Sequence, residues 1–267
     1  MTALPDSTQR RLGLVIDLDT CVGCHACVVH CKEWNTGGYP APLSDADPYG
    51  ADPTGTWLNR VHSYEVEAPG RTPRVVHFPK SCLHCEDAPC VTVCPTGASY
   101  KREEDGIVLV DEDLCIGCKL CAWACPYGAR EFDPPTGVMK KCTLCIDRIY
   151  NEHLSDPVPA CVSTCPARAR HYGDLADPDS EVSRLVAERG GYELMSETGC
   201  RPTNRYLPPR SREPAATAAG NAGDGGGDGA SPPVLEDAPA EGGFLGWIDR
   251  LLTAADRDPS PPPDSRP

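Results

Sequence analysis

Residues 115–126 read CIGCKLCAWACP, with cysteines separated by two, two and three residues and a proline after the last one. A [4Fe–4S] cube takes one soft thiolate at each of its four iron corners, and a tight loop with this spacing can wrap three of them. The fourth cysteine lies on a helical turn that points away, and it therefore reaches a neighbouring cube. The stretch predicts a close pair of clusters that share ligands, as in two-cluster bacterial ferredoxins.

Three other groups of four cysteines occur in the chain, so that sixteen of its 17 cysteines fall into four groups. The second group has spacings of two, four and three residues, and the fourth is split by a gap of fifteen residues. Because each cluster takes four cysteines, the groups predict four [4Fe–4S] clusters with all sixteen cysteines as iron ligands. In chain order the groups are Cys21, Cys24, Cys27 and Cys31; Cys82, Cys85, Cys90 and Cys94; Cys115, Cys118, Cys121 and Cys125; and Cys142, Cys145, Cys161 and Cys165.

The connections between groups indicate which of them share clusters. The segment Thr96–Leu114 joins the second and third groups compactly, with a turn at Glu104–Gly106, and looks like the crossover of a small two-cluster ferredoxin. The first and fourth groups then pair by elimination. Pairing the first group with the second and the third with the fourth also fits the spacing, so this alternative stays open.

Two other uses of clustered cysteine fit the pattern less well. A structural zinc site takes two cysteine pairs in a closed tetrahedron, which differs from the two-two-three spacing. Disulfides belong to oxidising compartments, whereas the apolar run Leu12–Ile16 is too short for an export signal and leads straight to Cys21. No stretch approaches the roughly 18 apolar residues of a membrane span. We therefore expect a cytoplasmic protein without a transmembrane segment of its own.

Charge and motif content narrow the function further. The net charge of −14 argues against nucleic acid as a partner, since phosphate binding requires a basic surface. The chain has no P-loop, no GxGxxG after a strand and no nucleophile motif. These absences indicate that it is not an enzyme by itself, and a chain loaded with one-electron carriers is expected to relay electrons.

Several residues beside the groups need an interpretation of their own. Cys200 stands apart and is expected to be a free thiol. His25, His84 and His153 are not needed as ligands, because each cluster already has four cysteines, so we expect them to be neighbouring or surface residues. The pair Lys140–Lys141 precedes Cys142 and could raise a cluster's reduction potential, although the pattern favours solvated side chains.

A repeated local pattern predicts the fold class. Short β-prone runs lead into the groups at Leu14–Leu18, Val75–Phe78, Ile107–Val110 and, more weakly, Met139–Lys141, and residues 12–18 and Val61–Val66 are predicted strands. Ala26–Cys31 and Leu120–Cys125 suit short helical turns. The expected fold is α+β, with two pseudo-symmetric bacterial two-[4Fe–4S] ferredoxin-like units with inserts, followed by a disordered tail.

Composition shifts place the expected boundaries. The four-cluster ferredoxin-like core covers residues 12–172, with an insert at 32–81. The remaining parts are an N-terminal extension at 1–11, an extended segment at 173–210 that packs on the core or a partner, a disordered linker at 211–242, a short amphipathic helix at 243–256 and a disordered end at 257–267.

The order of the four groups resembles the iron–sulfur B subunit of membrane-associated molybdopterin oxidoreductases, a family that includes dimethyl sulfoxide, polysulfide, tetrathionate and nitrate reductases. The resemblance covers about residues 12–172. In the nitrate reductase branch a tryptophan replaces one cysteine of the third group, whereas here that group is complete. The resemblance implies four clusters held by Cys21, Cys24, Cys27 and Cys165 (cluster 1); Cys31, Cys142, Cys145 and Cys161 (cluster 2); Cys82, Cys85, Cys90 and Cys125 (cluster 3); and Cys94, Cys115, Cys118 and Cys121 (cluster 4).

The resemblance also implies partners and a location. The protein would relay electrons between a molybdopterin catalytic subunit and an integral membrane, quinone-reactive subunit, and would lie peripherally on the inner face of the cytoplasmic membrane. The segments Lys32–Thr36, Asp47–Pro53, Val61–Glu65 and Gly199–Tyr206 are similar to the sulfite dehydrogenase branch, which suggests sulfite oxidation by the complex. The alternatives are a B subunit of a dimethyl sulfoxide, polysulfide or tetrathionate type of reductase and a free-standing polyferredoxin.

Overall fold

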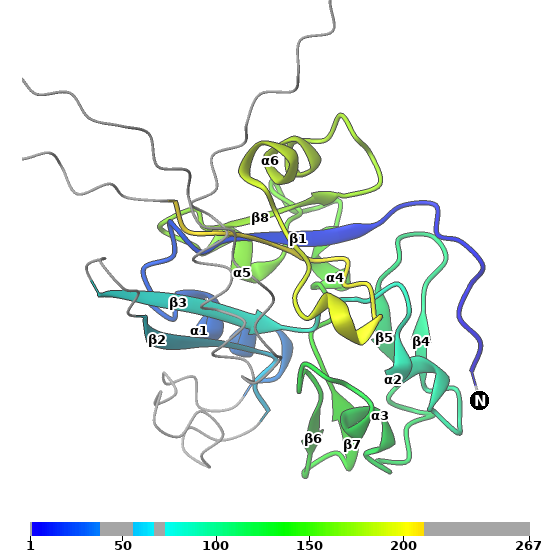
Figure 1. The fold of residues 1–267 in the computed structure, drawn as a ribbon. Coiled ribbons are helices and arrows are strands. Elements are labelled where there is room, and N and C mark those ends of the chain that lie inside the picture. Colours follow the sequence, from blue (N-terminus) through cyan, green and yellow to red (C-terminus); the bar gives the residue numbers. More distant parts are fainter. Residues whose placement is uncertain (1, 38–55, 67–72, 211–267) are drawn as a thin grey trace, which may run out of the picture. The chain divides into compact units, whose positions relative to one another are not determined.

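The computed structural model describes residues 2–37, 56–66 and 73–210 (Figure 1). The linker, amphipathic helix and disordered end expected at 211–242, 243–256 and 257–267 lie outside the described residues. The same holds for parts of the insert, at residues 38–55 and 67–72.

Four small sheets organise the described chain. The largest has β1 (Leu12–Asp17) in the middle, paired antiparallel with β8 (Arg170–Asp174) and parallel with β9 (Arg205–Leu207). The other three are two-stranded antiparallel ribbons, each built from strands that follow one another in the chain. They pair β2 (Asn59–Val66) with β3 (Arg74–Ser81), β4 (Ser99–Lys101) with β5 (Val108–Val110), and β6 (Glu131–Asp133) with β7 (Val138–Lys140).

Short helices lie within or beside the cysteine groups. They are α1 (Ala26–Asn35), α2 (Pro89–Thr92), α3 (Leu120–Trp123), α4 (Ile146–Ile149) and α5 (Ala160–Ser163), followed by α6 (Glu181–Arg189) and the 3-10 turn η1 (Ser196–Thr198). Helix α1 of the first group packs against α5 of the fourth, and α2 of the second packs against α3 of the third. The first and fourth groups therefore form one ferredoxin-like unit, and the second and third groups form another that is inserted between them in the chain.

The α+β fold with two ferredoxin-like units is confirmed. The runs expected to lead into the four groups are β1, β3, β5 and β7, the strand expected at Val61–Val66 lies within β2, and the helical turns expected in the first and third groups begin α1 and contain α3. Strands such as β1 and β5 follow from runs of β-branched and aliphatic residues, and α1 to α5 lie at cysteine loops that begin or end them.

Strand β1 forms the centre of the core. Leu14, Val15 and Ile16 have no exposed surface, because β8 and β9 lie on either side of the strand and other elements cover its two faces. On one face Val15 packs with Val182 of α6 and Leu207 of β9. The apolar run that precedes the first cysteine group is thus a buried strand.

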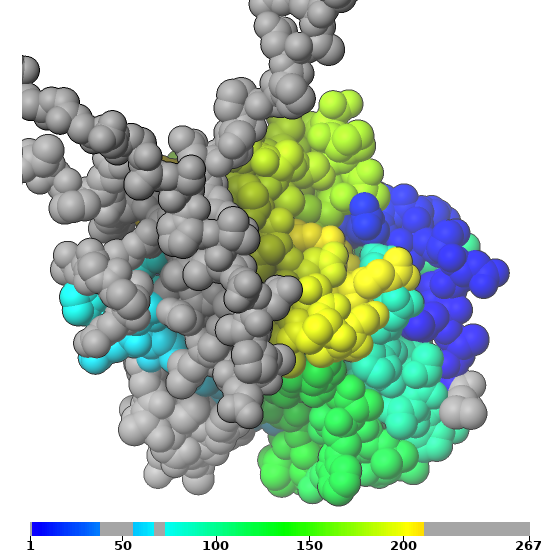
Figure 2. All heavy atoms as spheres, in the orientation of Figure 1, coloured from blue at the N-terminus to red at the C-terminus, as the bar shows by residue number. Residues whose placement is uncertain are grey.

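Residues 198–207 tie the two units together. The amide of Asn204 accepts a 2.8 Å hydrogen bond from the Leu14 N–H and donates a 3.1 Å bond to the Cys82 carbonyl. Tyr206 stacks on Phe78 of β3, with ring centroids 4.6 Å apart. The hydroxyls of Tyr127 and Thr198 lie 3.3 Å apart, and in Figure 2 this yellow segment lies against green residues of the second unit. The segment expected to lie over the core therefore includes β9 and α6.

In the part of the chain that the structure describes, α1 is the longest helix, at 10 residues, and no helix has the length and apolar character to cross a bilayer.

Candidate iron–sulfur cluster sites

The first Cys-x-x-Cys loop of each group has the same backbone turn. The residue before the second cysteine has a positive φ in every group: 65° at Gly23, 50° at His84, 65° at Gly117 and 58° at Leu144. Glycine adopts this left-handed region without steric cost, whereas His84 and Leu144 are held in it by their surroundings. The conformation curls the loop, so that the same cradle is built four times from different side chains.

A second repeated turn follows the last cysteine of three groups. The third residue after that cysteine has a positive φ: 77° at Gly97, 58° at Gly128 and 52° at Arg168. The backbone then returns toward the sulfur, so that the Ser99 N–H donates to Cys94 Sγ at 3.4 Å and the Ala169 N–H donates to Cys165 Sγ at 3.3 Å. Such bonds stabilise negative charge on sulfur, as a thiolate ligand requires.

Three cavities are each lined by four cysteines. Each combines three cysteines of one group with one cysteine of another. The groups that share cavities are the first with the fourth and the third with the second. The cavities are lined by Cys21, Cys24, Cys27 and Cys165; by Cys31, Cys142, Cys145 and Cys161; and by Cys94, Cys115, Cys118 and Cys121.

The remaining four cysteines of the groups also interact. Burial raises the pKa of the Cys85 thiol, and Cys82, Cys90 and Cys125 raise it further. Cys200 contributes to the same shift, so it lies beside this set. It is a free thiol, as expected, and it is buried rather than exposed.

Exposure of the thiols differs from set to set. Cys24 is exposed and belongs to the set Cys21, Cys24, Cys27 and Cys165. Cys118 is also exposed and belongs to the set Cys94, Cys115, Cys118 and Cys121. The set of Cys31 is buried throughout, and the set of Cys82 has three buried thiols and one half-buried thiol. Two sets therefore reach the surface and two lie inside.

Burial also determines the protonation of the inner thiols. It raises the pKa of Cys142 to about 12 and that of Cys161 to about 11, and neighbouring cysteines add to the first of these shifts. At neutral pH and without metal these groups are therefore protonated. Because the thiolate is the ligand, loading iron must displace their protons.

The donor set fits a polynuclear iron–sulfur group. All 17 cysteines are free thiols, so none is committed to a disulfide. Across residues 2–37, 56–66 and 73–210, no three His, Cys, Asp or Glu side chains converge closely enough to hold a single ion. Four thiols that surround a cavity, instead of meeting at a point, match a cube with one iron at each corner.

The histidines near the groups have distinct surroundings. His84 is fully buried, and its Nδ1 accepts a 3.2 Å bond from the Val108 N–H. Burial and the nearby Lys141 and Lys101 lower its pKa well below the usual value, so the ring is neutral. His25 lines the cavity of Cys21, and His153 is exposed.

Sequence reasoning missed five buried cations in the described part of the chain, of which Lys32 is 0 % and Lys101 is 8 % exposed. Arg130 is 6 % exposed, Arg170 is 4 % exposed and Lys141 is 3 % exposed. The interpretation of Lys140–Lys141 as solvated is therefore wrong for Lys141, because the chain folds over it. Lys140 is partly buried and forms ion pairs with Glu112 and Asp133. The repeated hexapeptides CPYGAR (125–130) and CPARAR (165–170) were the available signal for the two arginines.

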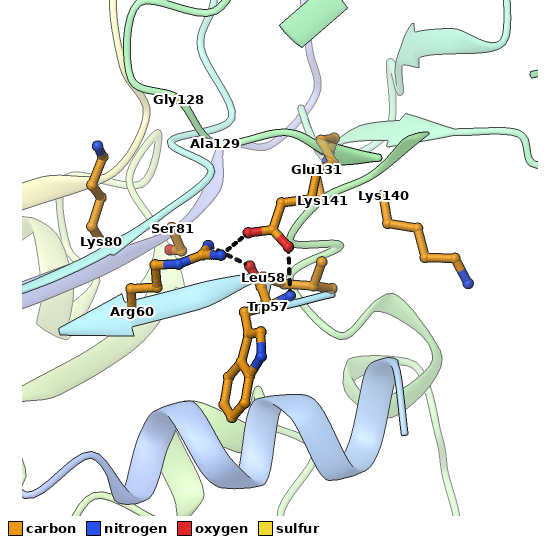
Figure 3. A pocket seen from close by; sticks show the side chains of 10 residues that line it. All are labelled: Trp57, Leu58, Arg60, Lys80, Ser81, Gly128, Ala129, Glu131, Lys140 and Lys141. Carbon is orange, nitrogen blue, oxygen red and sulfur yellow. Dashed lines mark hydrogen bonds and ion pairs between the residues drawn. The ribbon is translucent and has the colours of Figure 1, made fainter. Parts of the chain in front are cut away.

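A polar contact beside Lys141 joins the two units (Figure 3). Glu131 at the start of β6 forms an ion pair with Arg60 of β2, and it accepts a 2.6 Å hydrogen bond from the Trp57 N–H. Arg60 also donates to the Trp57 carbonyl at 2.7 Å. Figure 3 shows Arg60 and Glu131 pointing toward each other in a pocket that Lys141 also lines. This contact holds the β2–β3 ribbon against the second ferredoxin-like unit.

Comparisons with known proteins identify cluster-binding domains in this chain. Two family models, each described as a 4Fe-4S dicluster domain, match residues 20–98 and 73–175. Two dicluster domains correspond to four [4Fe–4S] clusters, the number expected from the cysteine groups.

Curated relatives span most of the same region. The B subunit of sulfite dehydrogenase from Allochromatium vinosum is 63 % identical over 202 residues, covering 75 % of this chain and 84 % of the relative. The putative iron–sulfur B subunit of dimethyl sulfoxide reductase from Halobacterium salinarum is 40 % identical, covering 73 % of this chain and 78 % of the relative. The B subunit of tetrathionate reductase from Salmonella typhimurium is 36 % identical, covering 75 % of this chain and 74 % of the relative.

Proposed function

The chain belongs to the 4Fe–4S dicluster family, among the iron–sulfur B subunits of oxidoreductase complexes, and from this premise we propose that it relays electrons between a molybdopterin catalytic subunit and a quinone-reactive membrane subunit. The relatives carry the names of oxidoreductase subunits, and the chain itself is non-catalytic. When bound, the clusters supply one-electron storage and transfer.

The proposed iron ligands follow the four sets of cysteines. Three of these sets each line one cavity, and the cysteines of the fourth interact electrostatically. The assignment gives Cys21, Cys24, Cys27 and Cys165 to cluster 1; Cys31, Cys142, Cys145 and Cys161 to cluster 2; Cys82, Cys85, Cys90 and Cys125 to cluster 3; and Cys94, Cys115, Cys118 and Cys121 to cluster 4.

The order of the relay follows from contacts between the sets. Clusters 1 and 2 share the first and fourth groups, and clusters 3 and 4 share the second and third. Cys31 and Cys142 of cluster 2 lie in one buried contact group with Cys82 of cluster 3. Electrons would thus pass from 1 to 2, 3 and 4, or in reverse, because ligand identity alone does not determine potentials.

The observation that carries the proposal is the exposure of the two ends. Cys24 of cluster 1 and Cys118 of cluster 4 are exposed, whereas the ligands between them are mostly buried. Exposed apolar side chains flank both: Val22 (60 %) lies beside Cys24, and Ile116 (65 %) and Trp123 (89 %) lie on either side of Cys118 in the chain. Exposed apolar surface of this kind marks protein contacts, so each end suits a partner subunit.

We assign the end of cluster 1 to the catalytic subunit and the end of cluster 4 to the membrane subunit. The location follows as the inner face of the cytoplasmic membrane, with attachment through that partner. The relative that is 63 % identical is named as a subunit of sulfite dehydrogenase, which supports sulfite as the substrate of the complex.

The test is purification of the tagged full chain from membranes of its native host after mild detergent extraction. We expect co-purification of a molybdenum-containing subunit and an integral membrane subunit, with sulfite reducing the clusters as seen by electron paramagnetic resonance (EPR). Recovery of a soluble monomer without molybdenum would contradict the proposal that the chain belongs to such a complex. The assignment of sulfite as the substrate would be overturned if the clusters did not react with sulfite but were reduced by quinol and then reoxidised by tetrathionate or dimethyl sulfoxide.

A further inference from the structure

Arg170 lies at the boundary between two cysteine sets. It lines both the cavity of Cys21, Cys24, Cys27 and Cys165 and the cavity of Cys31, Cys142, Cys145 and Cys161. Its Nη2 donates a 2.8 Å hydrogen bond to Asn59 Oδ1. Its Nη1 is buried without a hydrogen-bond partner among the described residues. A guanidinium with a spare buried donor thus stands between the sites of clusters 1 and 2.

Arg130 holds the corresponding place in the second unit. It lines the cavity of cluster 4, and its Nη2 donates a 2.9 Å hydrogen bond to Sγ of Cys90, which belongs to cluster 3. The same Nη2 donates a 2.7 Å bond to Ser99 Oγ. Its Nε and Nη1 are buried without partners in the described part of the chain. Arg130 therefore stands between the sites of clusters 3 and 4.

The two arginines are built in the same way. Each is the fifth residue after the last cysteine of its group, in the sequence Cys-Pro-x-x-Ala-Arg. Each donates to the first residue of the strand that follows the partner group, Asn59 at the start of β2 and Ser99 at the start of β4. The repetition of sequence, position and acceptor in both units argues that the placement has a common role.

Lys141 occupies the third junction. It precedes Cys142 of cluster 2, which is in one buried contact group with Cys82 of cluster 3. Its Nζ donates to the carbonyl of Val108 and, at 2.6 Å, to the carbonyl of Cys142. None of Lys141, Arg130 and Arg170 has a carboxylate within ion-pair distance among residues 2–37, 56–66 and 73–210.

A buried cation needs an opposite charge nearby, because removing it from water without one is costly. At each of these places the negative group would be an iron–sulfur cluster with four thiolates, which carries a charge of about −2 when oxidised. Reduction makes that charge more negative, so a cation in a poorly screened interior favours the reduced form. One cation between two clusters acts on both.

We propose that Arg170, Lys141 and Arg130 are the counter-ions of the three junctions of the relay, and that each raises the reduction potentials of the two clusters that flank it. This inference rests on the cluster assignment of the proposed function. The three residues touch or approach the ligands and are positioning residues for the clusters.

The test is an EPR-monitored redox titration of the full complex, comparing the wild type with Arg170→Gln, Arg130→Gln and Lys141→Met. Arg168→Gln is the matched control, because Arg168 is an exposed cation two residues from Arg170 and solvent screens its charge. We expect Arg170→Gln to lower the potentials of two clusters and Arg130→Gln to lower those of the other two. Lys141→Met should lower one from each pair, and Arg168→Gln should shift the potentials less than Arg170→Gln.

Unchanged potentials in the Arg170, Arg130 and Lys141 variants, with four clusters present, would overturn the inference. A shift in Arg170→Gln no larger than that in Arg168→Gln would do the same. Where a neutral variant loses clusters, the charge-retaining replacement at the same position decides, which is Arg170→Lys, Arg130→Lys or Lys141→Arg. The counter-ion role requires the retained charge to restore all four clusters, and failure to restore them contradicts it. A wild-type complex without four cluster signals would instead overturn the proposed function, before any variant is compared.

Discussion

Arg170 donates a 2.8 Å hydrogen bond from Nη2 to Oδ1 of Asn59, although the two residues are 111 positions apart in the chain. Arg170 begins β8 after the fourth cysteine group, and Asn59 begins β2 after the first. The bond therefore joins the two halves of the first ferredoxin-like unit across the inserted second unit. The pair Arg130 and Ser99 repeats the contact within the second unit, so the pseudo-symmetry extends to the polar core.

Replacement of Gly117 by alanine should distort the loop of the third group. The φ of this residue is +65°, and an added Cβ would collide with the backbone carbonyl of Gly137. We expect the steric cost of the left-handed conformation, about 1–2 kcal/mol, and an additional cost from the clash. Thermal loss of the cluster absorbance in the loaded chain measures the effect.

Gly137→Ala is the matched control for that prediction. Its φ is +71°, and nothing lies within 4 Å of the added Cβ, so it carries the conformational cost without the clash. The Gly117 variant should bleach at a clearly lower temperature than the Gly137 variant. Equal temperatures for the two variants would show that the close approach of the third loop to residue 137 is wrong.

Glu131→Ala should weaken the attachment of the β2–β3 ribbon to the second ferredoxin-like unit. The side chain is 18 % exposed, pairs with Arg60 and accepts a 2.6 Å bond from the Trp57 N–H. Loss of one partner of a largely buried pair should lower the free energy of unfolding by about 3 kcal/mol. Denaturant titration monitored by tryptophan fluorescence measures it.

Glu112→Ala tests the same kind of change where water screens it. Glu112 is 54 % exposed and lies 3.5 Å from Lys140, so its removal should cost less than about 1 kcal/mol. If Glu112→Ala destabilised the chain as much as Glu131→Ala, the importance of the buried contact in Figure 3 would be refuted.

Local sequence predicted the elements that cysteine spacing and short β-prone runs determine. The strands β1, β3, β5 and β7 lead into the groups because each apolar run ends at a cysteine loop. The buried cations were not predicted, since burial of Lys141 depends on contacts with residues far along the chain, such as Val108. The parallel pairing of β9 with β1 was missed for the same reason, because nearly 200 positions separate Ile16 from Tyr206.

Cys118→Ala should change one cluster and leave three intact. Cys118 lines the cavity of cluster 4 and is exposed, so its loss does not open a buried cavity. We expect one four-iron EPR signal to disappear or to be replaced by a three-iron signal, with at least tenfold slower quinone-linked turnover. Cys200→Ala is the control and should retain all four clusters. Normal turnover of the Cys118 variant would mean that electrons do not leave through this cluster.

Trp123→Ser should weaken binding of the membrane subunit without changing the clusters. The side chain is 89 % exposed, and a tryptophan at the centre of a contact often dominates its free energy. We expect at least about tenfold weaker association, equivalent to about 1.4 kcal/mol, by titration of the solubilised membrane subunit.

Val75→Ser is the control for that prediction, because Val75 is an apolar residue that is 53 % exposed on β3, outside the surface around Cys118. Its association with the membrane subunit should equal that of the wild type. If the Trp123 variant bound as tightly as the wild type, the apolar surface around Cys118 would not be part of the interface with the membrane subunit.

The most direct measurement is the content of iron and acid-labile sulfide in the full chain purified without oxygen. Four four-iron clusters predict about 16 atoms of each per chain, with all sixteen grouped cysteines protected from alkylation until the iron is removed. A folded, electron-transferring chain that contains zinc and no sulfide would contradict the account.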